Sequence, residues 1–216
     1  MQFIDGDTLE RGTYTRTRTD KERELTKILE NEIRNGSLKR IKKLGAYEIF
    51  LGLNSQWLKT LNALNYETQG KRILDLGCGA NGGNEESEKY NYLYEPWFCR
   101  FIYNTRDKTG LDIVGVDIGN LSGEEFPYKQ INLLGKYTLI NNFENSSFDL
   151  ITAFKLFNSP ELEKRITGEI ENNASVKASK KIKKILENQV VQILKPNGIF
   201  LWHGEGTDEE EDRHCF

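Results

Sequence analysis

The stretch RILDLGCGANGG, residues 72–83, joins a short apolar run to a turn that is rich in glycine. The run predicts a buried strand that ends near Asp75, and the glycines predict a turn out of that strand. Because glycine has no Cβ, a ligand can lie directly against the backbone at Gly77 and Gly79. A turn that binds nothing is the alternative interpretation of the same residues.

Short apolar runs alternate with helical patterns from residue 70 onward. An amphipathic pattern predicts a helix over 182–193, and Pro196-Asn197-Gly198 separates it from the next strand. The strands that we expect are 71–76, 111–117, 128–132, 148–154 and 198–203. This alternation is typical of an α/β fold in which helices cover both faces of a parallel sheet.

The chain before these strands is expected to be helical. Residues 1–18 are polar and predict a loose arm, whereas Thr19 to Glu22 form a capping box that opens a helix ending near Gly36. A further helix is expected over 57–64. We therefore divide the chain into an N-terminal arm and helical extension, an α/β domain and an acidic tail: 1–66, 67–206 and 207–216.

Composition narrows the class of protein. The chain has 216 residues, and its net charge of −3 does not call for nucleic acid. The basic residues over 39–43 permit an RNA or acidic-protein partner, and a solvated helix face explains them as well. No apolar run has the roughly 18 residues of a membrane span, and the first residues do not resemble a signal peptide. Three cysteines without CxxC spacing and two histidines argue against a disulfide framework or a metal site. We expect a cytoplasmic protein without membrane attachment.

Carboxylates at the ends of the first two expected strands bear on the choice of ligand. Asp75 would repel a pyrophosphate and attract a cationic amino group. Asp117 ends the stretch LDIVGVDIGN and could accept the hydroxyls of a ribose, or could instead cap a helix. Asp117 lies 117 − 75 = 42 positions after Asp75, about twice the usual ~20, so an insertion is expected between them.

Five stretches, in this order, are similar to the successive motifs of the class I S-adenosylmethionine-dependent methyltransferases: ILDLGCGANGG, IVGVDIG, YKQINLL, SFDLITAF and ILKPNGIFLW. The resemblance covers residues 70–203. It implies a doubly wound, mainly parallel sheet of strand order 3-2-1-4-5, flanked by helices. It also implies methyl transfer from S-adenosyl-L-methionine, without a metal, to an acceptor that could be a small molecule, a protein or RNA.

The resemblance further implies which residues bind the cofactor. Asp75, Gly77 and Gly79 would border its methionine part, while Asp117 would hold the ribose. The adenine would lie against Ile118. The remaining positions would lie near the adenine amino group or wall the methionine end, and they are Asn132, Leu133, Ala153 and Phe154.

The sequence departs from the family pattern in two internal segments. Residues 84–110 are long and aromatic; we expect Pro96 to open a displaced crossover helix, preceded by a loop, YNYLYE, over the cofactor mouth. The alternative is that these aromatic side chains pack the helix onto the sheet. Asn158-Ser159-Pro160 is loosely similar to an amino-group methyltransferase motif, but a turn at a helix start is the favoured interpretation.

The end of the chain departs from the family as well. The two strands that usually follow the fifth are missing, so we expect the N-terminal helices or a second subunit to cover that sheet edge. His203 and Glu205 could supply an acid or base, or could be structural. The short C-terminus leaves open a non-catalytic, cofactor-binding partner subunit. A nicotinamide dehydrogenase is disfavoured by Asp75.

Overall fold

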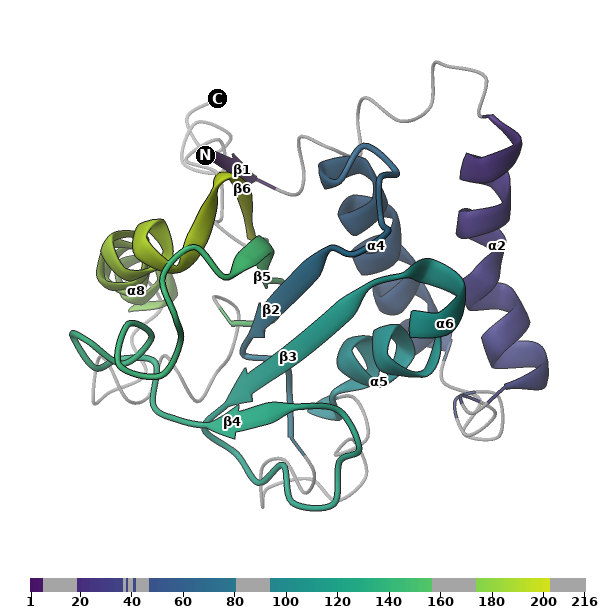
Figure 1. Ribbon diagram of the computed structural model, residues 1–216. Coiled ribbons are helices and arrows are strands. Elements are labelled where there is room, and N and C mark those ends of the chain that lie inside the picture. The colour runs from purple at the N-terminus through teal and green to yellow at the C-terminus, as the bar shows by residue number, and fades with distance from the viewer. Residues whose placement is uncertain are drawn as a thin grey trace, which may run out of the picture.

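A single sheet of six strands forms the centre of the molecule (Figure 1). The structure is a computed structural model that describes residues 1–5, 19–36, 38, 41, 47–80, 94–156 and 174–202, without the side chains of 174–183. The strands are β1 (Gln2–Asp5), β2 (Arg72–Leu76), β3 (Asp112–Asp117), β4 (Tyr128–Gln130), β5 (Phe148–Ala153) and β6 (Leu194–Trp202). Every pair of neighbouring strands is parallel, in the order β1-β6-β5-β2-β3-β4.

This topology confirms the expected α/β fold. In chain order, the five strands expected from sequence are β2 to β6, and they lie in the order β4-β3-β2-β5-β6, which is the order 3-2-1-4-5. From β2 the chain first builds the sheet in one direction through β3 and β4, and then continues on the other side with β5 and β6. The strand order therefore reverses beside β2, where open α/β sheets bind ligands.

The expectation of a loose arm at the N-terminus is wrong for its first residues. Residues 2–5 form β1, which pairs with β6 from Gln2 opposite Ile199 to Asp5 opposite Trp202. The ring of Phe3 lies 5.7 Å, edge to face, from that of Phe200, and the N-terminal ammonium donates to the Pro196 carbonyl at 2.8 Å. The edge that we expected helices or a second subunit to cover is thus extended by the chain's own first strand.

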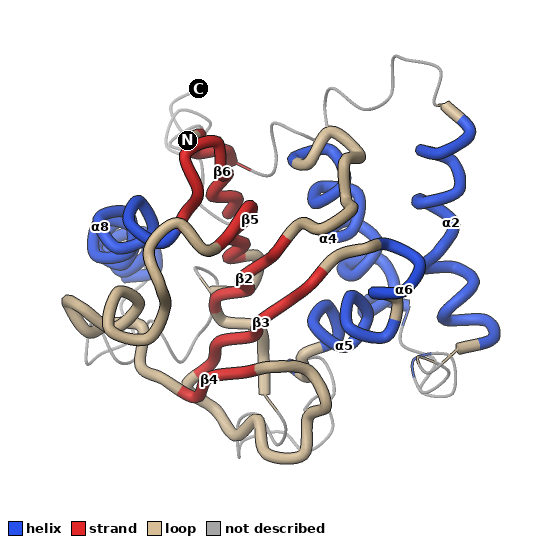
Figure 2. Tube along the Cα trace, viewed as in Figure 1, coloured by secondary structure: helices blue, strands red, loops and turns tan. Residues whose placement is uncertain are grey.

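Helices cover both faces of the sheet (Figure 2). One face carries α2 (Asp20–Asn35), α4 (Tyr47–Ala63), α5 (Trp97–Asn104) and α6 (Arg106–Thr109). Leu29 of α2, Trp57 of α4 and Phe101 of α5 share a buried cluster there with Ile73 and Ile113 of the sheet. The opposite face carries α8 (Ala174–Ile193), whose Leu186, Val190 and Ile193 are buried. The N-terminal helices therefore pack into the same core as the strands.

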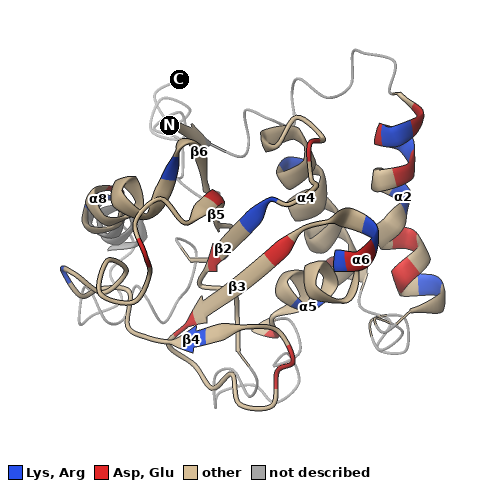
Figure 3. Ribbon diagram, in the orientation of Figure 1, with Lys and Arg blue, Asp and Glu red and all other residues tan. Residues whose placement is uncertain are grey.

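The helix ends follow the capping rules. Thr19 accepts from the Glu22 backbone N–H while the Glu22 carboxylate accepts from Thr19, so the expected capping box opens α2. Gly36 closes α2 through a bond to the Glu32 carbonyl. Acidic and basic residues alternate along the exposed side of α2 (Figure 3), as on a solvated face. Helix α4 begins at Tyr47, ten residues before the expected start.

The last strand begins earlier than expected. Strand β6 starts at Leu194, opposite Phe148, but Leu150 already lies opposite Ile199, so the two strands lose register in between. The turn-forming residues Pro196-Asn197-Gly198 lie in this irregularity. They interrupt the ladder rather than preceding the strand.

The aromatic insertion contributes directly to the core. Pro96 directly precedes α5, as expected for a displaced crossover helix. The rings of Trp57 and Phe101 lie 5.1 Å apart, and those of Phe98 and Phe154 lie 5.6 Å apart, both edge to face. These contacts support the alternative in which aromatic residues of α5 pack the helix onto the sheet.

Several of the sequence features lie outside the described residues: Asn158-Ser159-Pro160, the segment of His203 and Glu205, and the acidic tail 207–216. The basic residues at 39, 40, 42 and 43 and the first four residues of the expected loop YNYLYE also lie outside them. In the part of the chain that the structure describes, helices are too short or too polar to cross a membrane.

Candidate functional site

The turn after β2 requires glycine at two positions. Gly77 has φ 68° and Gly79 has φ 94°, both in the left-handed region that residues with a Cβ rarely adopt. A Cβ on Gly79 would lie 2.1 Å from the Tyr94 carbonyl oxygen, and one on Gly77 would lie 3.0 Å from Leu156. The backbone N–H of Ala80 donates to the same Tyr94 oxygen at 3.0 Å. The turn after β2 is therefore packed closely between the backbone at Tyr94 and the residue Leu156.

Asp117 connects this turn to the one that follows β3. Its Oδ2 accepts from the Gly79 backbone N–H at 2.9 Å, and its Oδ1 accepts from the Gly119 N–H at 2.8 Å. The structure shows turns rather than a helix directly after Asp117, so the helix-cap alternative does not hold. A carboxylate has about four acceptor positions, so two remain for further donors such as hydroxyl groups.

Asp75 lies beneath the turn, with only 4% of its surface exposed. Its Oδ1 accepts from the Thr152 hydroxyl at 2.7 Å, and the Cys99 thiol lies 3.7 Å from its Oδ2. Burial raises the pKa of Asp75 to about 6, although the bond from Thr152 and the positive charge of Lys155 act in the opposite direction. Asp75 is therefore a buried carboxyl that exchanges its proton near neutral pH.

Two thiols flank this carboxyl. A Cβ added at Gly115 would lie 3.0 Å from Cys78 Sγ and 3.1 Å from Cys99 Sγ, so both sulfurs border the same point of β3. Both cysteines are buried and free. Burial raises the pKa of each thiol. They are consequently protonated at neutral pH and serve as packing and weak donor groups.

Lys155 follows β5 and supplies the positive charge of the site. Its Nζ donates to the Glu95 carbonyl at 3.1 Å, and the residue is half-buried. Loss of solvent lowers its pKa, while Asp75 and Asp117 partly oppose this change. The candidate site thus combines two carboxylates with one ammonium group.

A buried ion-pair network fixes the segment that covers the turn. The Arg100 guanidinium bonds to the carboxylates of Glu95 and Glu124 and stacks 4.9 Å over the Trp97 ring. Burial alone would lower the pKa of Arg100, but the bonds to Glu124 and Glu95 raise it overall. Tyr94 and Glu95, which lie against Gly79, are therefore anchored through α5 and the turn before β4.

The other expected site residues divide into an exposed and a buried group. Ile118 is half-buried beside Asp117, and its carbonyl accepts from the Gln130 side chain at 3.2 Å. Asn132 is exposed, and its Oδ1 accepts from the Leu134 backbone N–H at 3.0 Å. Both lie near the carboxyl ends of β3 and β4. The buried group packs in the two hydrophobic cores and comprises Leu133, Ala153 and Phe154.

Thr152 and Lys155 shape the site but are not among the residues expected from sequence. Thr152 lies within the stretch SFDLITAF, and Lys155 directly follows it. A polar residue within or directly after an apolar strand is the sequence feature that could have identified them. Thr152 lies opposite Asp75 in the β2–β5 ladder. Because the sequence does not give the register between β2 and β5, the contact between Thr152 and Asp75 could not be predicted from it.

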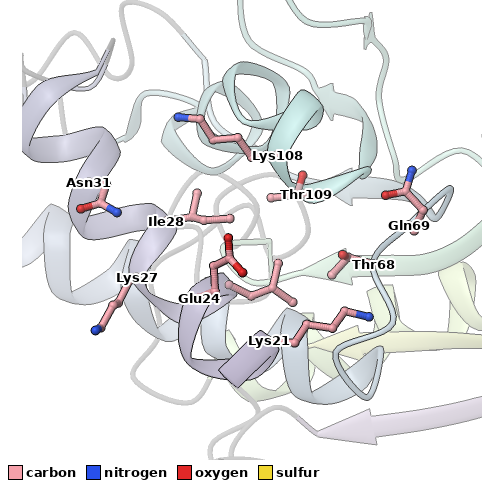
Figure 4. Close-up of a pocket in the computed structure, with 10 residues that line it drawn as sticks. Lys21, Glu24, Lys27, Ile28, Asn31, Thr68, Gln69, Lys108 and Thr109 are labelled. Atoms are coloured by element: carbon pink, nitrogen blue, oxygen red, sulfur yellow. The ribbon is translucent and has the colours of Figure 1, made fainter. Parts of the chain in front are cut away.

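A separate cavity lies near the amino-terminal ends of β2 and β3, whereas the glycine turn follows the carboxyl end of β2 (Figure 4). It has a volume of 480 Å³ between α2, α6 and the loop before β2, with buried Ile28 and Thr68 in its wall. Three lysines and Glu24 line it, but Lys108 already pairs with Glu32 and Lys21 lies 3.8 Å from Glu67. This mixed charge favours no single class of ligand, and none of the expected site residues lies there.

Comparison of the chain with models of known protein families gives no match, and comparison with curated proteins gives none either.

Proposed function

We propose that this chain is an S-adenosyl-L-methionine-dependent methyltransferase whose acceptor is a small molecule, a protein or RNA. One observation carries the proposal: Asp75 and Asp117 lie at the carboxyl ends of adjacent parallel strands, with a close glycine turn between them. This is the place beside the reversal of strand order where α/β sheets bind nucleotides. The free thiols suit a reducing compartment such as the cytoplasm.

Charge distinguishes this cofactor from a dinucleotide. With Asp75 and Asp117 ionised and Lys155 protonated, these three groups carry a net charge of −1, which complements a sulfonium ligand. Two carboxylates beside the turn would repel a pyrophosphate. The site is therefore better suited to S-adenosylmethionine than to a nicotinamide dinucleotide.

The residues have distinct tasks in this proposal. Asp117 would accept ribose hydroxyls through its remaining lone pairs, and the turn at Gly77 and Gly79 would let the ligand approach the backbone. When bound, the cofactor supplies a methyl group on a sulfonium that an acceptor displaces in line, without a metal. The protein's contribution is then to align the acceptor at near-attack distance.

Calorimetry tests the proposal. The wild-type chain is expected to bind S-adenosylhomocysteine and not NAD. The Asp117→Asn variant is expected to bind S-adenosylhomocysteine at least about tenfold more weakly, because a charge-assisted bond to a ribose hydroxyl is lost. Asp112→Asn is the matched control, since Asp112 is an exposed carboxylate at the other end of the same strand. Equal affinity of the wild type and Asp117→Asn would refute the assignment of Asp117.

A second measurement addresses catalysis. Transfer of a labelled methyl group from the cofactor into a cell extract is expected for the wild-type chain. Cofactor binding without any transfer would instead indicate a non-catalytic partner subunit. Binding of NAD in preference to both adenosyl ligands would overturn the proposal.

A further inference from the structure

Lys155 is fixed over the site by its neighbours. Its Nζ donates to the Glu95 carbonyl, which also accepts from the Trp97 backbone N–H at 2.8 Å. Glu95 is in turn held by Arg100, whose guanidinium bonds to its carboxylate. The ammonium group is therefore restrained at the carboxyl end of β5, next to β2, instead of moving freely in solvent.

The ammonium retains capacity to bind a ligand. Lysine has three N–H donors, and the contact to Glu95 uses one of them. The groups whose charge or potential charge acts on it are Asp75, Asp117, Cys78 and Cys99. Among ion pairs between described residues, none joins Lys155 to Asp75 or Asp117, so the ammonium is not neutralised by a direct contact with either carboxylate.

Separated opposite charges complement a zwitterion. An α-amino acid carries an ammonium and a carboxylate on one carbon, and each finds a partner of opposite sign when the two charged side chains flank it. Lysine binds a carboxylate as a compact point charge. Removal of part of the solvent from Lys155 strengthens such an attraction relative to water.

We propose that Lys155 binds the carboxylate of the ligand's α-amino-acid group, while the side of the site next to Asp75 receives the ammonium. This inference rests on the proposed function, because S-adenosylmethionine ends in an α-amino acid. Lys155 is then a specificity-determining residue that distinguishes the intact cofactor from adenosyl compounds without a carboxylate.

A pair of ligands that differ only in the carboxylate tests the inference. Calorimetry would compare S-adenosylmethionine with its decarboxylated form on the wild type, Lys155→Met and Lys155→Arg. The wild type is expected to prefer the intact ligand by about 10- to 100-fold, as for a charge-assisted bond. Lys155→Met is expected to lose that preference by binding only the intact ligand more weakly, and Lys155→Arg to retain part of it. Lys136→Met, which removes an exposed lysine elsewhere, is expected to behave as the wild type.

The outcomes separate the two proposals. If the wild type binds neither ligand, the proposed function fails and the role of Lys155 fails with it. If the wild type prefers the intact ligand but Lys155→Met retains the preference, only the role of Lys155 is overturned. If Lys155→Met weakens both ligands equally, Lys155 acts structurally through Glu95, and the inference is again wrong.

Discussion

Replacement of Asp75 by asparagine is expected to stabilise the fold at neutral pH. Burial raises the pKa of Asp75 from 3.8 to about 6, so the folded state holds its proton more tightly than the unfolded state does. A difference of about two pKa units corresponds to about 3 kcal/mol of destabilisation once the pH is above 6. Asparagine has nearly the same shape, accepts from Thr152 in the same way and carries no charge.

The sign of the pH dependence follows from linkage. Between pH 3.8 and about 6 the folded state binds more protons at Asp75 than the unfolded state, so this group lowers stability as the pH rises. The free energy of unfolding of Asp75→Asn minus that of the wild type should therefore increase by about 2 kcal/mol from about pH 4.5 to about pH 7.5. Other titrating groups cancel in this difference.

Urea denaturation at several pH values measures the effect, with both proteins studied in the same buffers. Asp149→Asn is a useful contrast, because the bonds from Lys195, Arg72 and Lys71 outweigh the effect of burial and lower the pKa of Asp149. The difference for that variant should have the opposite slope at acidic pH. A difference for Asp75→Asn that does not change with pH would refute the reasoning, because it would show that folding leaves the proton affinity of Asp75 unaltered.

Two further predictions concern the covering segment and the turn. Gly79→Ala should lower the free energy of unfolding by several kcal/mol, because a Cβ would lie 2.1 Å from the Tyr94 oxygen. Gly52→Ala in α4 should raise the free energy of unfolding by about 0.5–1 kcal/mol, because there is open space around its Cβ. Chemical denaturation of both variants checks the contrast. Arg100→Met should cost about 3–5 kcal/mol because it removes the guanidinium that pairs with the largely buried carboxylates of Glu95 and Glu124, while the exposed Arg106→Met should cost less than about 0.5 kcal/mol. Equal losses in thermal unfolding would contradict the importance of the network.

The sequence predicted β2, β3 and β5 well because their central residues are buried on both faces. Such strands appear as short continuous apolar runs, and their observed bounds differ from the expected ones by one residue. Strand β4 is exposed or half-buried, and it ends two residues earlier than expected. Strand β1 has no such pattern. Its four residues are ordered by pairing with the edge of β6, a long-range interaction that local sequence does not encode.

The helix expected from sequence is shorter than α4 because long-range packing, which local sequence does not encode, also extends this element. Its first half contains Gly52 and the aromatic residues Tyr47 and Phe50, which are weak or neutral helix formers. Ile49 and Leu53 are buried one turn apart and continue the stripe that leads to Trp57. Tertiary packing of that stripe therefore extends the helix beyond what propensity alone predicts.

Site residues that directly follow a strand could be predicted from sequence. Contacts between residues on different strands could not. Glycines after β2 and a carboxylate after β3 are local signals, and the structure brings Gly79 and Asp117 into direct contact. The bond from Thr152 to Asp75 and the approach of Tyr94 to Gly79 join residues distant in sequence. Their identification requires the register of β2 against β5 and the path of the insertion.

The free energy stored at Asp75 bears on the function of the site. A turn that served only to reverse the chain would be more stable with a neutral residue at this position, because burial of the carboxylate costs about 3 kcal/mol above pH 6. The half-buried ammonium of Lys155, whose pKa is lowered by loss of solvent, is a second unfavourable charge in the same region. Two such charges, gathered where the strand order reverses, are typical of a binding site rather than of a structural turn. This concentration of unfavourable charges supports the binding site that we propose there.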